Sequence, residues 1–248
     1  MTLEQFVGMF SLLAVQLRAT DADEATMRGY FEALKDIEPE FLAMAATELA
    51  RTAEWFPKTS EWRAAALRVL ACLWGVTDEA LLRRVALATG ADVPVCLAGK
   101  AAFMSGIGER LDPVPALPPA WLVLANPGVA VPTPDVFHAR QGPFSKAASF
   151  AGPVRDLEAL VVLLRERGND LSAPAERLAP AIRKVLQALG DLAGMRLVRM
   201  SGSGATCFGL CAGRGEAEAA AAALSALHAG WWIAAAPLVC DSHEFMPR

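Results

Sequence analysis

The chain has 248 residues, of which 54% are hydrophobic and 20% charged, with a net charge of −4 and a mean hydropathy of +0.33. This composition excludes a disordered or low-complexity protein, because it supplies enough apolar side chain to offset chain entropy. The near balance of 23 basic and 27 acidic residues gives no indication of a nucleic-acid or anionic-membrane partner. The charge is unevenly spread, because residues 1–63 hold 11 acidic and 6 basic residues. This difference is a first indication that residues 1–63 and the rest of the chain have different origins.

The cysteines and the apolar stretches favour a soluble cytoplasmic protein. Five cysteines without a CxxC spacing predict free thiols in a reducing compartment rather than disulfides or a zinc site. The N-terminus has an early Glu4 and no basic region, unlike a signal peptide. Residues 219–240 are uncharged, but Gly230 and Pro237 interrupt them, so they predict a helix and a strand rather than a membrane span.

Residues 1–63 are predicted to form an all-helical segment. Apolar residues at three-and-four spacing predict three helices, the third beginning at Pro39. Pro57, followed by Thr59 and Ser60, predicts the turn that ends the segment. Nothing in it could do chemistry, so we expect a packing module or a surface for a protein partner. The first helix depends on Leu3, Phe6, Phe10, Leu13 and Leu17, and capping boxes at Thr2–Gln5 and Asp21–Glu24 would begin the first two helices.

Residues 64–248 are predicted to be α+β. Two helices followed by strand, strand, helix and strand give a sheet covered by helices on one face. The expected elements are a helix over 64–74 ended by Gly75, a helix over 78–89 capped by Thr77 and ended by Gly90, a hairpin over 101–114, a strand over 121–126, helices over 154–167 and 176–189, a strand over 195–200, a glycine turn over 201–204, a strand over 205–213, a helix over 216–229 and a strand over 231–239.

Several well-known catalytic signatures are missing from the sequence. Gly99 and Lys100 are followed by alanine rather than serine or threonine, and no glycine precedes Gly99 by five residues, so they form no P-loop. Gly202 and Gly204 have no third glycine at Rossmann spacing. No GxSxG, HExxH or kinase HRD set occurs. Three less familiar clusters remain as candidate sites.

The first cluster is Gly90-Ala91-Asp92-Val93-Pro94. A carboxylate that follows a glycine and precedes an X-Pro step is held in a defined turn geometry, as a group that meets a substrate hydroxyl must be. The alternative from the residues alone is that Asp92 merely caps a turn.

The second cluster is the glycine loop, defined here as Ser201, Gly202, Ser203, Gly204, Ala205 and Thr206. Glycines between two strands free backbone amides to face an anion, and Ser203 adds a hydroxyl. A plain hairpin turn explains the same residues about equally well.

The third cluster runs from Asn126 to Phe137. Its prolines predict an extended segment after a strand, which could present Thr133 and Phe137 to a ligand. The alternative is that Phe137 is a core residue, since its side chain is apolar.

Taken in order, six sequence blocks resemble the 4-diphosphocytidyl-2-C-methyl-D-erythritol kinases, a family of the GHMP kinase superfamily. The resemblance covers about residues 64–239. The blocks are LACLWGV, GADVPVCLAG, FMSGIGERLDPV, LVLANPGVAVPTPDVF, NDL and MSGSGATCFGL. The resemblance implies a GHMP-type C-terminal portion with a ferredoxin-like layout. In this arrangement residues 64–110 are a remnant of the first kinase domain, and residues 111–248 form the C-terminal domain.

The resemblance also implies an activity and roles for individual residues. The expected reaction is ATP-dependent phosphorylation, with Mg²⁺, of the 2-hydroxyl of 4-diphosphocytidyl-2-C-methyl-D-erythritol in non-mevalonate isoprenoid biosynthesis. Asp92 would be the catalytic acid/base, and Thr133 and Phe137 would line the cytidine pocket. The glycine loop, Ser201 to Thr206, would lie beside the phosphates. A site spread over several segments suits phosphoryl transfer, which depends mainly on positioning and charge stabilisation.

The sequence departs from the family before Ala64. The family's lysine-bearing PAKINL-like strand and its glycine-rich phosphate loop are not found, and Lys35 and Lys58 do not lie in a matching motif. Two other functions therefore stay open: a non-catalytic protein that binds a partner or a cytidine ligand, and a GHMP kinase for another small alcohol.

Overall fold

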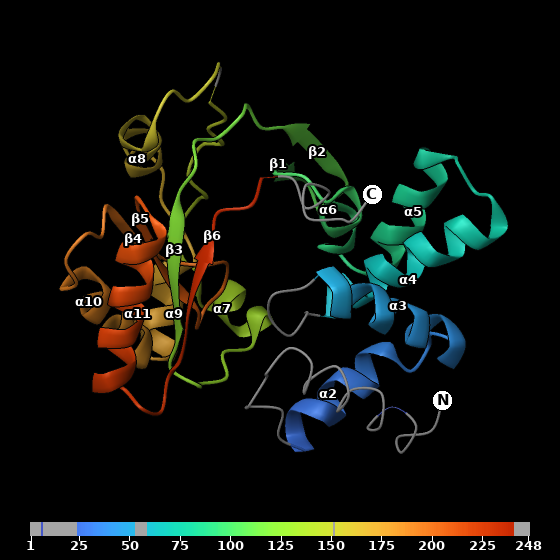
Figure 1. Ribbon diagram of the computed structural model, residues 1–248, viewed down its shortest axis with the longest axis horizontal. Helices are drawn as coiled ribbons and strands as arrows, with labels where there is room; N and C mark the ends of the chain where they lie inside the picture. The colour runs from blue at the N-terminus through green and yellow to red at the C-terminus, as the bar shows by residue number, and fades with distance from the viewer. Residues whose placement is uncertain (1–5, 7–23, 53–58, 151, 241–248) are drawn as a thin grey trace. The chain divides into compact units, whose positions relative to one another are not determined.

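The computed structural model describes residue 6 and residues 24–52, 59–150 and 152–240, and the chain forms two compact units (Figure 1). The described part of the first unit ends at Pro113, and the second unit comprises Val114–Cys240. The expected domain boundary between Arg63 and Ala64 instead falls inside a helix, α4. The expected division after Arg110 falls inside strand β2.

The described part of the first unit is mostly helical and ends in a two-stranded hairpin. Strands β1 and β2 are antiparallel, as predicted for the FMSGIGER segment. Its elements are α2 (Glu24–Leu34), α3 (Pro39–Thr52), α4 (Thr59–Trp74), α5 (Glu79–Thr89), α6 (Val93–Ala98), β1 (Ala102–Ser105) and β2 (Arg110–Pro113).

Helix α4 joins the N-terminal helices to the rest of the first unit. It begins at Thr59, where the sequence predicted a turn, so that expectation was wrong. Trp62 packs in one core with α2 and α3, and Ala64 packs in another with Val93 of α6. Two ion pairs tie α4 to its neighbours: Arg63 binds Asp36 in a forked pair, and Arg68 binds Glu48 of α3 at 2.7 Å. The helix therefore packs on both sides as one rigid element.

Helix ends in this unit follow the expected chemistry with one correction. Helix α3 begins at Pro39 as predicted, and α4 stops before Gly75, whose φ of +62° suits glycine. The cap of α5 is Asp78, whose carboxylate accepts hydrogen bonds from the amides of Ala80 and Leu81. Thr77 is thus not the cap. The expected first helix, apart from buried Phe6, and both capping boxes lie outside the residues whose side chains are described.

The second unit is built on a four-stranded antiparallel sheet with strand order β4-β5-β3-β6. Along the chain the pattern is strand, helices, two strands, helix and strand, which is the ferredoxin-like layout. This confirms the α+β prediction. The strands are β3 (Trp121–Asn126), β4 (Leu197–Met200), β5 (Cys207–Cys211) and β6 (Trp232–Pro237).

Helices cover both faces of this sheet to different extents, so the expectation of helices on one face only was wrong. Alternate residues of β3 point to opposite faces. Val123 joins the core beneath α10 (Ala181–Gly190) and α11 (Arg214–Leu227), whereas Leu122 packs with α8 (Leu157–Arg165) (Figure 1). The larger core thus lies between the sheet and the α10–α11 layer.

Two predicted elements of the second unit need correction. The helix expected over 176–189 is two helices, α9 (Ser172–Leu178) and α10, because Pro180 begins a new helix. The segment expected to be extended contains a helix, α7 (Thr133–Ala139), with Pro134 in its first turn, a position that proline tolerates.

The cysteines are free thiols, as the sequence predicted. Cys207 and Cys211 lie buried on the same face of β5, whereas Cys72 is exposed. Burial raises the pKa of the Cys207 thiol to about 12, so this sulfur stays protonated at neutral pH. No described helix is long and apolar enough to cross a membrane.

Candidate functional site

In the first unit, Asp92 lies at the start of the short helix α6. The next two residues, Val93 and Pro94, are buried and hold this turn in place, while Asp92 itself is exposed. Its carboxylate makes no capping hydrogen bond to the helix. The interpretation of Asp92 as a cap is therefore not supported.

A close backbone contact fixes the turn that carries Asp92. Gly108, in the loop between β1 and β2, has φ of +103°, and a Cβ there would lie 2.1 Å from the carbonyl oxygen of Ala91. Only glycine fits so near a backbone oxygen. Gly108 thus lets the hairpin pack directly against Ala91, the residue before Asp92.

In the second unit, the structure brings together two segments that the sequence separates by 70 residues. The hydroxyls of Thr133, at the start of α7, and Ser203, in the glycine loop, form a hydrogen bond of 2.8 Å. Both predicted binding clusters of this unit therefore contribute polar side chains to one site.

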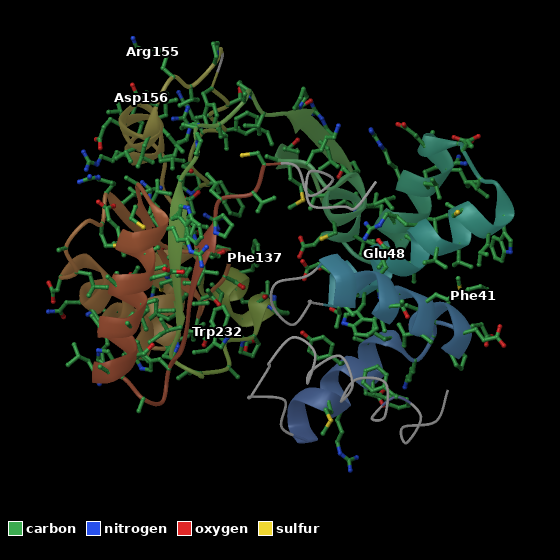
Figure 2. The ribbon with its side chains drawn as sticks, in the orientation of Figure 1. Phe41, Glu48, Phe137, Arg155, Asp156 and Trp232 are labelled. Carbon is green, nitrogen blue, oxygen red and sulfur yellow. The ribbon has the colours of Figure 1, made fainter. Side chains whose placement is uncertain are left out.

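Helix α7 decides which of its apolar residues faces outward. Val136 is fully buried and anchors the helix, while Phe137 is 49% exposed (Figure 2). The alternative that Phe137 is a core residue was therefore wrong. Since Phe137 follows Thr133 by four residues, both lie on one face of the helix. The arrangement exposes an aromatic ring and a hydroxyl on the same face of α7.

The glycine loop is a tight turn with an open outer side. The amide of Ser201 donates to Thr206 and that of Gly204 donates to Ser201, which closes the turn. Gly202 has φ of +53°, and a Cβ there would meet no atom within 4 Å. A small anion can therefore approach this backbone closely.

Two asparagines that the sequence analysis did not single out hold this loop in place. The Asn126 amide donates to the Thr206 hydroxyl at 2.9 Å, and its oxygen accepts from the amide of Gly128. The Asn169 amide donates to the carbonyl oxygens of Met200 and Gly202. Both asparagines lie inside sequence blocks noted above, LVLANPGVAVPTPDVF and NDL. An asparagine close to the end of a strand or the start of a helix was the signal in the sequence that could have identified them.

The donors in this site suit phosphate more than a metal cage. Among residues 24–52, 59–150 and 152–240, no three His, Cys, Asp or Glu side chains gather in a way that could hold a metal ion. Mg²⁺ in phosphoryl-transfer enzymes is usually held by one or two carboxylates together with substrate phosphates, so such a cluster is not required. The hydroxyls and the Gly202 amide, which takes no part in the hydrogen bonds that close the turn, can bind phosphate oxygens, and the exposed ring of Phe137 can stack on a base.

Residues 147–229 match the family model described as "GHMP kinases C terminal". The chain is 56% identical over 177 residues to the 4-diphosphocytidyl-2-C-methyl-D-erythritol kinase of Paramagnetospirillum magneticum, and 49% identical over 180 residues to that of Rhodospirillum rubrum. With the kinase of the same name from Parvibaculum lavamentivorans it shares 41% identity over 92% of this chain and 87% of the relative. The chain belongs to this kinase family.

The extent of the similarity varies among these 4-diphosphocytidyl-2-C-methyl-D-erythritol kinases. The chain spans only 62% and 59% of the lengths of the first two relatives. The alignment with the P. lavamentivorans kinase covers 92% of this chain, which is a larger share than residues 64–248 make up. The alignment therefore includes part of residues 1–63. The similarity is thus not confined to the region over which the sequence blocks were recognised.

Solved structures give the same family and fold. A crystal structure of a 4-(cytidine 5′-diphospho)-2C-methyl-D-erythritol kinase matches with a TM-score of 0.56 and 31% identity, over 81% of this chain and 79% of that one. A homoserine kinase from Cytophaga hutchinsonii matches with a TM-score of 0.58 at 15% identity, over 82% of this chain and 76% of that one, which shows the fold alone.

Proposed function

We propose that this chain phosphorylates the 2-hydroxyl of 4-diphosphocytidyl-2-C-methyl-D-erythritol, with ATP as the donor. The observation that carries the proposal is the hydrogen bond between Thr133 and Ser203, which joins the α7 segment to the glycine loop beside the exposed ring of Phe137. The relatives named for this reaction support it, since the chain shares 41–56% identity with them.

Each candidate residue has its own proposed chemical task. Phe137 would stack on the cytosine ring, and the Thr133 and Ser203 hydroxyls with the amide of Gly202 would hold phosphate oxygens. Asp92 would accept the proton of the substrate's 2-hydroxyl while the hydroxyl oxygen forms a bond to the γ-phosphorus of ATP. The bond between that phosphorus and the departing ADP breaks. Mg²⁺, when bound with ATP, would neutralise charge on the phosphates.

An assay of phosphoryl transfer tests the proposal directly. The purified chain is incubated with Mg-ATP and 4-diphosphocytidyl-2-C-methyl-D-erythritol. The formation of ADP is followed over time, and the phosphorylated product is examined by phosphorus NMR. We expect ADP to appear only when this acceptor is present, with one new phosphomonoester signal. Equal or faster turnover of homoserine would instead indicate a GHMP kinase for another small alcohol.

The exposed ring of Phe137 leads to a prediction for the acceptor side. Phe137→Ala should weaken binding of a cytidine diphosphate ligand by about 1–3 kcal/mol, the usual value of base–aromatic stacking. Its melting temperature should be nearly unchanged, because the ring is half exposed. Calorimetric titration of both proteins with cytidine 5′-diphosphate measures the effect.

Val162→Ala is the matched control for that experiment. Val162 is 56% exposed on α8, a helix that contributes nothing to the proposed site, so its removal should leave the affinity unchanged. If Phe137→Ala instead unfolds while the affinity per folded molecule stays the same, the stacking role is wrong.

A second candidate function, ligand binding without turnover, is favoured by the residues before Ala64. Gly8 and Gly29 are the only glycines there, so this stretch contains no glycine-rich phosphate loop. The first unit also carries exposed apolar side chains: Trp74, which contacts Phe41 edge-on, is 69% exposed, and Leu73, its neighbour in the chain, is 54% exposed. Such a patch is typical of a protein-interaction surface.

The two candidates make different predictions for ATP. A chain that only binds its cytidine ligand should bind Mg-ATP more weakly than about 1 mM, which corresponds to less than about 4 kcal/mol. Separate calorimetric titrations with Mg-ATP and with cytidine 5′-diphosphate distinguish the cases. Micromolar affinity for Mg-ATP would exclude the non-catalytic candidate and require phosphate contacts from other residues of the chain.

A cytoplasmic location is part of the proposed function. Free buried thiols such as those of Cys207 and Cys211 persist in a reducing compartment. The expected partners are the small-molecule substrates, and a protein partner for the N-terminal helices belongs to the second candidate.

A further inference from the structure

The segment Asn169-Asp170-Leu171, between α8 and α9, has been given no contact with the ligand, yet it contacts two of the loops around it. The Asn169 side-chain nitrogen donates to the carbonyl oxygens of Gly202 at 2.8 Å and Met200 at 3.1 Å. The Asn169 side-chain oxygen accepts from the amide of Leu171 at 3.0 Å. Both hydrogens of the amide and its oxygen are therefore in use, which fixes its orientation.

Asp170 binds a second loop on the other side. One of its carboxylate oxygens accepts from the amide of Ser145 at 2.8 Å and from the Ser145 hydroxyl at 2.9 Å. These hydrogen bonds, together with the nearby charge of Arg140, hold the pKa of Asp170 below its usual value. Adjacent residues thus join the glycine loop to the segment that follows α7.

The contact with Gly202 bears on the part of the glycine loop that has the fewest restraints. The backbone bonds within the loop involve Ser201, Gly204 and Thr206, and Asn126 holds Thr206. The Gly202 carbonyl is bound by Asn169. A glycine loses more conformational freedom on ordering than any other residue, so a loop fixed in advance binds a ligand with a smaller entropic penalty.

We propose that Asn169 is a positioning residue, which holds the glycine loop in its ligand-binding shape through the Gly202 and Met200 carbonyls. The proposal rests on the proposed function only for the ligand, a nucleoside diphosphate. Asn169 acts on the ligand through its hydrogen bonds to the loop backbone, without a role in proton transfer. Asp170 extends the same support to the Ser145 segment.

Two variants of Asn169 separate positioning from packing. Asn169→Ala removes the whole amide. Asn169→Asp keeps the size and an oxygen for the Leu171 amide, but it loses both N–H donors and places a carboxylate against two carbonyl oxygens. Cytidine 5′-diphosphate should bind about tenfold or more weakly to each variant, which corresponds to about 1.4 kcal/mol. If Asn169 only fills space, Asn169→Asp should restore the affinity.

Asp156→Ala provides a matched control for stability. Asp156 caps α8 by accepting from the amide of Ala159. It lies at the opposite end of the second unit from Trp232 (Figure 2). Trp232 marks the end near the glycine loop, because its partner in the sheet is Asn126, which binds Thr206 of that loop. Asp156→Ala should lower the melting temperature without changing the affinity.

Hydrogen exchange of the unliganded protein tests the positioning without reference to function. We expect faster exchange across residues 201–206 in both Asn169 variants and wild-type exchange there in Asp156→Ala. Unchanged loop exchange, an affinity within twofold of wild type, or full rescue by Asn169→Asp would overturn the proposal. If the wild type itself fails to bind cytidine 5′-diphosphate, the proposed function is wrong, and the exchange result still decides the role of Asn169.

Discussion

Asp92→Asn should lower the rate of phosphoryl transfer by a factor of about 10²–10⁴, the usual range for loss of a general base. Asparagine has the same shape, but it cannot accept the proton of the substrate hydroxyl. Because the Asp92 side chain is exposed and caps nothing, the free energy of unfolding should stay nearly the same. Turnover under saturating Mg-ATP and acceptor, with melting curves on the same samples, measures both quantities.

Asp78→Ala is the control for this experiment, since Asp78 is an aspartate of the first unit that caps a helix. Its carboxylate accepts from two amides of α5, so its loss should cost about 1 kcal/mol of stability and leave the rate unchanged. The opposite pattern, in which Asp92→Asn loses stability but keeps its rate, would remove the catalytic assignment.

The largest expected effect on stability is at Trp62, the fully buried residue at the start of α4. Trp62→Ala should lower the free energy of unfolding by about 3–5 kcal/mol, as is usual for a large aromatic residue in a core. Its Nε1 has no hydrogen-bond partner in the described part of the chain, so Trp62→Phe also removes an unpaired donor and should lose less than about 2 kcal/mol. Urea unfolding followed by circular dichroism gives both values.

Trp74, at the other end of the same helix, is the internal control. It is 69% exposed and touches Phe41 only edge-on, so Trp74→Ala should change stability by less than about 1 kcal/mol. An equal loss for Trp62→Phe and Trp62→Ala would mean that the indole nitrogen contributes a hydrogen bond.

Local patterns in the sequence predicted most elements of the fold, because periodicity and end signals act over a few residues. The β1–β2 hairpin and the strand-turn-strand around the glycine loop follow the prediction. The errors occurred where two local signals competed. Proline at Pro134 and polar residues at Thr59 and Ser60 indicate loops by composition, yet each also suits the first turn of a helix, and packing chose the helix.

The sequence by itself determined the family, the α+β class and the segments that contain the candidate site. Six ordered blocks carry that information, and composition or spacing alone does not assign a role to Asp92, Thr133 or Phe137. The site residues remain predictions, although their surroundings are now described.

Only the tertiary structure decided which of those residues meet. Pairing of β3 with β5, and packing of α7 beside the same end of the sheet, bring Thr133 to Ser203 across 70 positions in the chain. Burial of Val136 turns Phe137 outward, and Asn169 reaches Gly202 across 33 positions. No local pattern encodes such contacts, because they depend on strand register and core packing, which the whole unit determines together.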